Sequence, residues 1–197
     1  MAFALTGARV FDGASLHDGM SVIVEGRVIT DVLPASQLPR SIEIQNLKGG
    51  LLSAGFIDVQ VNGGGGALMN DHPTIETVRR IAEAHRKFGT TGLLPTVITD
   101  DQTVIDQAVG AVHSAIKSKV PGVLGIHLEG PFLDLDRKGA HPANFIRTMT
   151  ESDVRRIAAI ACGSVMLTLA PNRVSAKFIS ELSQHRSEEH TSELQSL

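Results

Sequence analysis

The sequence predicts an α/β fold, in which a short all-β segment precedes parallel strands that alternate with helices. Two observations support this prediction. From residue 55 onward, apolar strand-like runs alternate four times with stretches of helical spacing, which is the pattern of a parallel sheet. Before residue 55, short strand-like runs are separated by turns instead. The 197 residues suffice for one ordinary domain, or for a small domain and part of a larger one.

The first 54 residues contain four strand-like runs. These runs cover residues 8–11, 20–24, 28–32 and 41–47. Gly26 lies in the tight Glu-Gly-Arg turn between the second and third runs, which is typical of a hairpin. In the last run, Ile42 and Ile44 lie on one side of the strand and polar residues on the other. We expect a β layer too thin to hold a core of its own.

Four strand–helix pairs follow this layer. The strands are expected at 56–61, 93–98, 123–128 and 165–169, and the helices at 74–88, 101–118, 150–161 and 174–182. Gly89 is placed to end the first helix, and Thr150 with Asp153 forms a candidate capping box for the third. Four units are half of an eight-unit barrel of about 250 residues. The sequence therefore predicts a partial (β/α)8 TIM-type barrel, and periodicity alone leaves a doubly wound open sheet as the alternative.

Composition narrows the classes of function. The net charge is -3, and acids and bases are mixed along the chain, so no basic face for nucleic acid is expected. The N-terminus lacks the features of a signal peptide, and no apolar run approaches the about 20 residues that span a bilayer. We therefore expect a cytoplasmic protein with no membrane partner. The single cysteine, Cys162, excludes an internal disulfide, and its apolar neighbours predict burial.

Polar residues mark the end of the first predicted barrel strand. Asp58, Gln60 and Asn62 share one strand face because successive side chains alternate. Polar groups on the inner face of an apolar strand are costly unless something hydrogen-bonds them. Glycines 63–66 follow and would allow close approach of the backbone to a ligand. A polar turn with a satisfied amide pair is the structural alternative.

Two further candidates lie at the end of the third strand and in the loop after it. His127 and Glu129 face the same way, and a carboxylate with a nearby imidazole suits a metal ligand with a supporting group. His141 lies in the long loop 130–148, and long ordered loops at strand ends usually bind something. The alternative is a salt-bridging acid and a core histidine. Because barrels work at the carboxyl ends of their strands, we expect the candidates to converge.

Five strings in order resemble the N-acetylglucosamine-6-phosphate deacetylase family of the amidohydrolase superfamily, over residues 1 to about 185. They are GFIDVQVNG at 55–63, GTTG at 89–92 with PT at 95–96, HLEGPF at 127–132, KGAH at 138–141 and TLAP at 168–171. The resemblance implies a metal-dependent amidohydrolase barrel, begun by residues 55–185, and a small β-sandwich to which residues 1–54 belong. Residues 186–197 resemble a translated sequencing adapter and are predicted to be a non-native or disordered tail.

The resemblance implies removal of the N-acetyl group of N-acetylglucosamine 6-phosphate, which gives glucosamine 6-phosphate and acetate in amino-sugar catabolism. The implied site residues are Glu129 as a metal ligand, Ala140 and His141 as contacts of the sugar phosphate, and Gln60, Asn62 and His127 at the periphery of the metal site. Most amidohydrolases have His-x-His where this chain has Gln60-x-Asn62, so one divalent ion, with zinc expected, is implied in place of two. The ion would activate water and polarise the acetamide carbonyl.

The family's two histidine ligands and its catalytic aspartate would come from later strands, which are absent from this sequence. Catalytic zinc takes about three protein ligands, so we expect the chain as given to be an inactive truncation of a homo-oligomeric enzyme. Another cyclic-amide amidohydrolase is one alternative, for which histidines would be expected at positions 60 and 62. A non-catalytic half-barrel binding or interaction module is the other. Ser53, Ala54 and Asn172 depart from the residues usual in the family.

Overall fold

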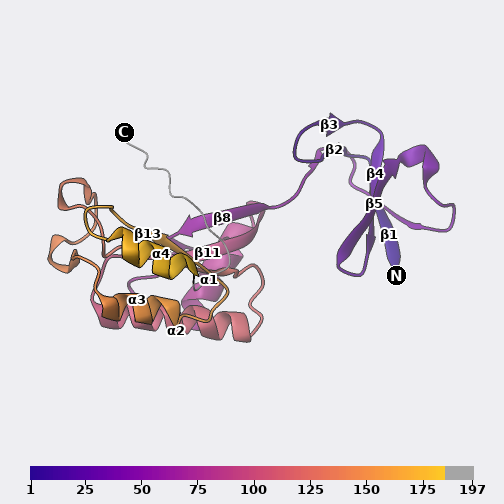
Figure 1. Cartoon of the computed structure of the whole chain (residues 1–197). Coiled ribbons are helices and arrows are strands. Elements are labelled where there is room, and N and C mark those ends of the chain that lie inside the picture. Colours follow the sequence, from indigo (N-terminus) through magenta and orange to yellow (C-terminus); the bar gives the residue numbers. More distant parts are fainter. Residues whose placement is uncertain (185–197) are drawn as a thin grey trace. The chain divides into compact units, whose positions relative to one another are not determined.

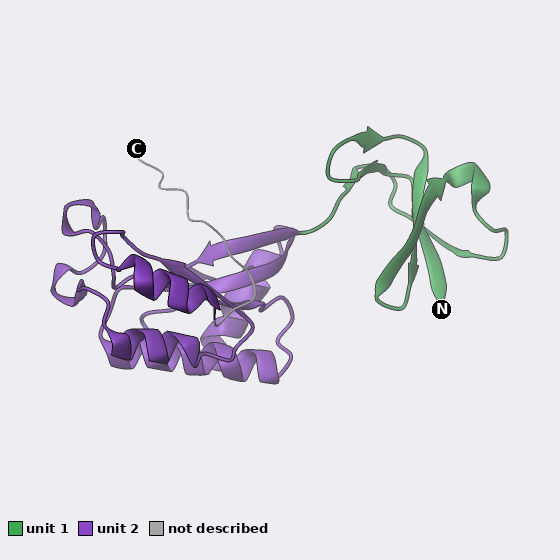
Figure 2. Cartoon of the chain, viewed as in Figure 1, with its two compact units in different colours: residues 1–55 green, residues 56–197 purple. Residues whose placement is uncertain are grey.

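The computed structural model describes residues 1–184, which form two compact units that divide between Gly55 and Phe56 (Figures 1 and 2). Each unit is a folded body with its own sheets. No helix within the described residues is both long enough and apolar enough to cross a bilayer. The predicted tail, 186–197, lies outside the described residues.

The first unit is built from strands and one 3-10 turn, η1 (Ala35–Gln37). It forms two sheets, of order β5-β4-β1-β6 and β3-β2-β7. The strands are β1 (Ala2–Thr6), β2 (Arg9–Phe11), β3 (Leu16–His17), β4 (Met20–Glu25), β5 (Val28–Pro34), β6 (Glu43–Asn46) and β7 (Leu51–Leu52). The predicted hairpin is confirmed, because β4 and β5 are antiparallel and Gly26 between them has a φ of 60°. Sequence patterns did not predict β1, which pairs with both β4 and β6.

The first unit has a small core of its own, although the sequence predicts a β layer too thin to hold one. Ala4, Val10 and Val22 are buried in it. Ile29 and Ile44, in contrast, are 63% and 57% exposed. Exposed aliphatic side chains on strands leave apolar surface that a further element could cover.

The second unit contains a parallel four-stranded sheet of order β13-β12-β11-β8 (Figure 1). Its elements are β8 (Phe56–Val61), β9 (Gly63–Gly64), β10 (Ala67–Leu68), α1 (Ile75–Arg86), β11 (Thr90–Ile98), α2 (Gln102–Lys117), β12 (Gly125–Glu129), η2 (Leu135–Arg137), η3 (Ala143–Phe145), α3 (Glu151–Ala158), β13 (Ser164–Thr168) and α4 (Ala176–Gln184). The α/β prediction with four strand–helix pairs is confirmed. Among these four strands the order follows the chain, without the reversal that marks a doubly wound sheet.

One apolar core joins the sheet of the second unit to its helices. It contains Ile81 of α1, Val112 of α2 and Ile157 of α3, packed with strand residues. On β12, Ile126 and Leu128 belong to this core. Because side chains alternate along a strand, His127 and Glu129 lie on the opposite face of the sheet. The packing of the helices therefore dictates which face carries the polar residues.

Helix limits differ from the prediction where side chains or turns override periodicity. The capping box of Thr150 and Asp153 is present, but α3 ends at Ala158 because the chain must turn into β13. Gly163 makes that turn with a φ of 71°. Helix α4 begins two residues later than predicted, since Ser175 accepts a hydrogen bond from the Phe178 N–H at 3.3 Å.

Candidate active site

The polar residues at the carboxyl ends of β8 and β12 converge. Gln60 Nε2 donates to Glu129 Oε1 at 2.9 Å, and Asn62 Nδ2 donates to Glu129 Oε2 at 3.4 Å. The Glu129 side chain is only 18% exposed. Two neutral amides therefore hold both oxygens of one carboxylate. Both amides are satisfied within the protein, and their shared partner is the carboxylate of Glu129.

His141 reaches the same carboxylate from the loop after β12. Its Nε2 lies 3.8 Å from Glu129 Oε1. Thr99, which follows β11, donates its backbone N–H to His141 Nδ1 at 3.3 Å, and the Thr99 hydroxyl lies 2.9 Å from that nitrogen. Nδ1 of His141 therefore faces Thr99, and Nε2 faces Glu129. Ala140 is exposed in the turn just before His141.

Arg147 closes the base of the loop that carries His141. Its guanidinium donates to both oxygens of Asp153, each at 2.6 Å, and lies 5.0 Å from the centre of the Phe132 ring. Its backbone N–H donates to the carbonyl of Pro131 at 3.1 Å. Burial by itself would raise the pKa of Asp153, but hydrogen bonds from Arg147 and Thr150 lower it to about 2. The loop is thus fastened at its two ends, with His141 between them.

His127 lies beneath Glu129 and is 1% exposed. Its Nε2 is 2.8 Å from Thr168 Oγ1, and its Nδ1 is 3.4 Å from Thr96 Oγ1. Burial lowers the pKa of His127, although Glu129 and the Val59 backbone act in the opposite direction. The ring is therefore a buried, hydrogen-bonded histidine one layer below the converging groups.

The glycine-rich run after β8 packs closely against neighbouring parts of the second unit. Glycines 63 and 64 form β9, which pairs with β10, and Gly65 and Gly66 make the turn between them with φ of 60° and 76°. A Cβ at Gly63 would collide with the carbonyl of Ala67. The carbonyl of Gly63 lies 3.0 Å from His85 Nε2 of α1. The lack of a side chain at Gly63 is therefore needed for packing within the unit.

Three polar residues that the sequence interpretation missed hold these strand ends. Thr99 and Thr168 contact His141 and His127, as described above. Asn70 accepts from the Ile98 N–H at 3.0 Å and donates to Asp100 Oδ2 at 2.9 Å, which ties the turn after β10 to the end of β11. Thr99 follows β11 directly, Thr168 is the last residue of β13, and Asn70 lies two residues after β10, so a position at or near a strand end was the available signal.

The acids of the loop after β12 make local structural contacts. Asp134 accepts from the Asp136 N–H at 2.8 Å and from the Asn172 amide. These bonds, first that from Asp136, lower the pKa of Asp134. Asparagine at 172 is explained by this contact, since a glutamate there would meet a second carboxylate. Nothing in the structure explains Ser53 and Ala54.

The fit of a metal ion to this cluster is partial. Within residues 1–184, no group of three or more His, Cys, Asp or Glu side chains could hold an ion. Glu129 offers carboxylate oxygens, whereas Gln60 and Asn62 present N–H donors to it. His141 Nε2 is directed at Glu129 Oε1, 3.8 Å away. The described residues thus supply one ligand, where catalytic zinc takes about three.

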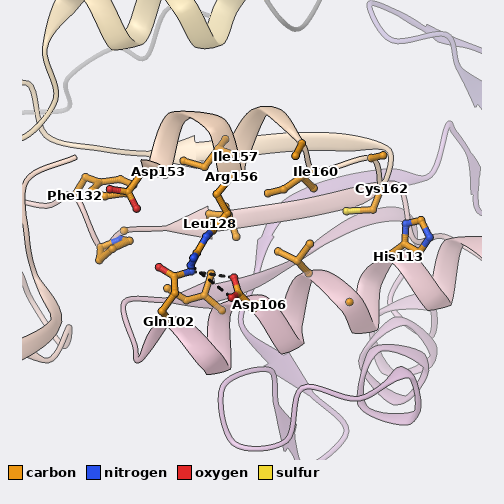
Figure 3. Close-up of a pocket in the computed structure, with 17 residues that line it drawn as sticks. Gln102, Asp106, His113, Leu128, Phe132, Asp153, Arg156, Ile157, Ile160 and Cys162 are labelled. Atoms are coloured by element: carbon orange, nitrogen blue, oxygen red, sulfur yellow. Dashed lines mark hydrogen bonds and ion pairs between the residues drawn. The ribbon is translucent and has the colours of Figure 1, made fainter. Parts of the chain in front are cut away.

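A hollow of about 520 Å³ lies on the helix side of the sheet between α2 and α3 (Figure 3). Apolar side chains line most of it, including Leu128, Phe132 and Ile157. Asp106 and Arg156, 3.5 Å apart, form an ion pair beside it. None of the predicted site residues lines this hollow. We therefore place the candidate chemistry at the strand ends, where the titratable groups converge.

A parallel sheet whose strand ends gather a carboxylate, two amides and a loop imidazole defines an α/β domain with an enzyme-like site. Residues 2–52 match the family model described as NagA composite domain. The N-acetylgalactosamine-6-phosphate deacetylase of Shewanella sp. (strain ANA-3) is 48% identical over 136 residues, which are 69% of this chain and 34% of that protein. The N-acetylglucosamine-6-phosphate deacetylase of Haemophilus influenzae is 32% identical over 188 residues, 91% of this chain and 49% of that protein.

Solved structures agree with these relatives. N-acetylglucosamine-6-phosphate deacetylase from Pasteurella multocida superposes with a TM-score of 0.88 at 29% identity, over 94% of this chain and 49% of that chain. The Mycobacterium smegmatis enzyme, solved as a mutant in complex with N-acetyl-D-glucosamine-6-phosphate, gives 0.82 at 27% identity over 93% and 48%. The chain spans between a third and a half of the curated relatives (34% and 49%). It is related to the N-terminal half of N-acetylglucosamine-6-phosphate deacetylases.

Proposed function

We propose that this chain carries the N-terminal half of the active site of a metal-dependent deacetylase for 6-phosphorylated N-acetylamino sugars. One observation carries the proposal: Gln60 and Asn62 of the first barrel strand converge on Glu129 of the third. The relation to deacetylases gives this cluster its chemistry. The reaction would release acetate and leave the amine of the amino-sugar phosphate.

The proposed fold of the whole enzyme is a (β/α)8 barrel with a small β-sandwich. Strands β8, β11, β12 and β13 would be its first four strands, in agreement with their parallel and sequential order. The apolar side chains exposed on β8, with Phe56 67% and Ile57 66% exposed, would be covered when the barrel closes. The exposed strands of residues 1–55 would be covered in the same way when the sandwich is completed.

Each residue of the cluster has a proposed role. Glu129 would be one ligand of a single divalent ion, with zinc expected, while Gln60 and Asn62 orient its two oxygens. When bound, the ion would polarise the acetamide carbonyl and promote formation of the nucleophile from water. His141 and Ala140 would contact the sugar phosphate. The remaining ligands and the catalytic aspartate would come from a segment outside this chain.

The substrate has two candidates that differ in the configuration of one sugar carbon. N-acetylglucosamine 6-phosphate is the substrate in the names of most of the related proteins. N-acetylgalactosamine 6-phosphate is favoured by a specific observation, since the relative with 48% identity is named for it. An assay should therefore compare the two sugar phosphates directly.

The experiment that tests this function joins residues 1–184 to the C-terminal half of the Haemophilus influenzae relative. We expect the 197-residue chain to release no acetate, and the chimera, loaded with zinc, to release acetate from one or both sugar phosphates. Glu129→Ala in the chimera should abolish the release. A folded chimera that melts cooperatively and binds zinc, yet releases no acetate from either sugar, would contradict the proposal.

The other readings of the sequence predict different outcomes. A cyclic-amide amidohydrolase would hydrolyse a cyclic amide in the chimera assay, and position 60 or 62 would be expected to bind metal. A non-catalytic binding module would bind the sugar phosphate without any dependence on Glu129. For the whole enzyme we further propose a cytoplasmic location and a homo-oligomer, which fractionation and light scattering can test.

A further inference from the structure

Side chains from three strands meet in a buried polar layer directly under Glu129. His127 of β12 lies between Thr96 of β11, 3.4 Å from its Nδ1, and Thr168 of β13, 2.8 Å from its Nε2. Thr96 is fully buried and His127 nearly so, at 0% and 1% exposed. In the parallel register, Thr96 pairs with His127, and Thr168 pairs with Glu129. The imidazole of His127 therefore bridges β11 and β13 next to Glu129.

The fourth strand, β8, joins this layer through Thr96. The register of β8 and β11 shifts between Leu93 and Pro95, and proline has no N–H to give to a neighbouring strand. The Thr96 hydroxyl compensates, because it accepts from the Val61 N–H at 2.8 Å. Val61 lies between Gln60 and Asn62. The position of these two amides along the sheet is thus coupled to Thr96 and, through it, to His127.

The hydrogen-bond inventory assigns the direction of each contact. The Thr96 hydroxyl donates to the carbonyl of Leu94 at 3.1 Å, so toward His127 it can only accept. His127 Nδ1 must then carry the ring proton, and Nε2 must accept from the Thr168 hydroxyl. The ring thereby acts as a directional link between β11 and β13.

We propose that His127 is a positioning residue, which holds the ends of β8, β11 and β13 so that Gln60 and Asn62 meet Glu129. Its significance for catalysis rests on the proposed function, but the geometric effect does not. Thr96 and Thr168 are its partners in this role. Each of the three residues would act through the orientation of Glu129.

The side-chain amide signals of Gln60 and Asn62 report this positioning directly. We would record them by ¹H–¹⁵N NMR in the 197-residue chain, in solution or on sedimented material if the chain self-associates. His127→Leu removes both links, Thr168→Val removes one, and Thr168→Ser keeps the hydroxyl. Thr91→Val is the matched control, because Thr91 joins β11 to the carbonyl of Phe56 at the opposite end of β8. The methyl signals of Val97 and Ile126 verify that each variant is folded.

The expected result is a shift of both amide signals toward those of solvent-exposed amides, with faster exchange, in His127→Leu and Thr168→Val. Thr168→Ser should restore the wild-type signals, and Thr91→Val should leave them in place. A loss of global stability alone would not move native-state signals, so the shift separates positioning from mere support. Unchanged amide signals in folded Thr168→Val would overturn the proposal, even if His127→Leu fails to fold. The measurement needs no metal, substrate or acetate release. Its result can therefore be interpreted even if the proposed function is wrong.

Discussion

At the scale of single residues, the site depends on how one carboxylate is held. Glu129 accepts from two neutral amides, and Gln60 supplies the shorter of the two bonds, at 2.9 Å. Groups that orient a metal ligand contribute about 10- to 100-fold to metal affinity or activity. Gln60 is therefore expected to raise metal affinity or activity, although it is not itself a ligand.

In the chimera, Gln60→Ala should lower zinc affinity or acetate release by about 10- to 100-fold. Gln60→Glu should lower zinc affinity or acetate release further, because it places a second carboxylate beside Glu129. Zinc content and acetate release measure both effects. Gln107→Ala, an exposed change on α2, is the control and should have no effect. Equal activity of Gln60→Ala and the parent would refute the orienting role.

The Arg147–Asp153 pair provides a pH-dependent term in stability. The pKa of Asp153 is lowered to about 2 in the folded chain, against about 3.9 for an unperturbed aspartate. The depressed pKa means that its contribution is complete above about pH 4 and is lost as the pH falls toward 2. Asp153→Asn should therefore destabilise the chain by about 2 kcal/mol at neutral pH and by less near pH 2.

Urea unfolding at several pH values measures this difference. The matched control is Glu151→Gln, which breaks the exposed Glu151–Arg155 pair on the same helix. Exposed pairs contribute about 0.2–1 kcal/mol, so the control should change stability little. A loss of the same size for both variants would show that burial of the Asp153 pair is unimportant.

At the scale of elements, replacement of two different glycines by alanine is expected to change stability in opposite directions. Gly110 lies within α2 with open space around it, whereas a Cβ at Gly125 of β12 would collide with the carbonyl of Ser164 in β13. Gly110→Ala should stabilise the chain by about 0.5–1 kcal/mol, since alanine is the better helix former. Gly125→Ala should destabilise it by about 3 kcal/mol, because β12 and β13 would be forced apart. Thermal unfolding of the two variants measures these changes in stability. Stabilisation by Gly125→Ala would contradict the close packing of β12 and β13.

The sequence predicts the elements whose cause is local. Apolar periodicity predicts α1 and α2 closely, because the side chains it selects, such as Ile81 and Val112, are those of the core. It does not predict β1, whose short run pairs with residues far along the chain. The convergence of Gln60 and Asn62 on Glu129 was predictable from strand alternation and the common edge of parallel strands. The parts played by Thr99 and Thr168 were not, since threonine is common in strands and its partners are defined only by the register.

At the scale of the whole molecule, β8 and β13 are the edges of the sheet in the second unit. Val59 of β8 is 43% exposed, next to the still more exposed Phe56 and Ile57. An open edge with apolar side chains promotes pairing between chains. We expect the 197-residue chain to self-associate, and Ile57→Lys to reduce the association.

Size-exclusion chromatography with light scattering measures this association. Phe88→Lys is the control, because Phe88 is 81% exposed but lies outside the strands. It should leave the association unchanged. A wild-type chain that is monodisperse, monomeric and melts cooperatively would contradict the prediction.

The central claim is that residues far apart in the sequence build one half of a deacetylase site around Glu129. A crystal structure of the chain tests it most directly, through the distances from the Glu129 carboxylate to the amides of Gln60 and Asn62. We predict that both amides lie within hydrogen-bond reach, with Gln60 Nε2 near 2.9 Å from Glu129 Oε1. Amides that point away from Glu129, or that lie on the core face of the sheet, would contradict the account.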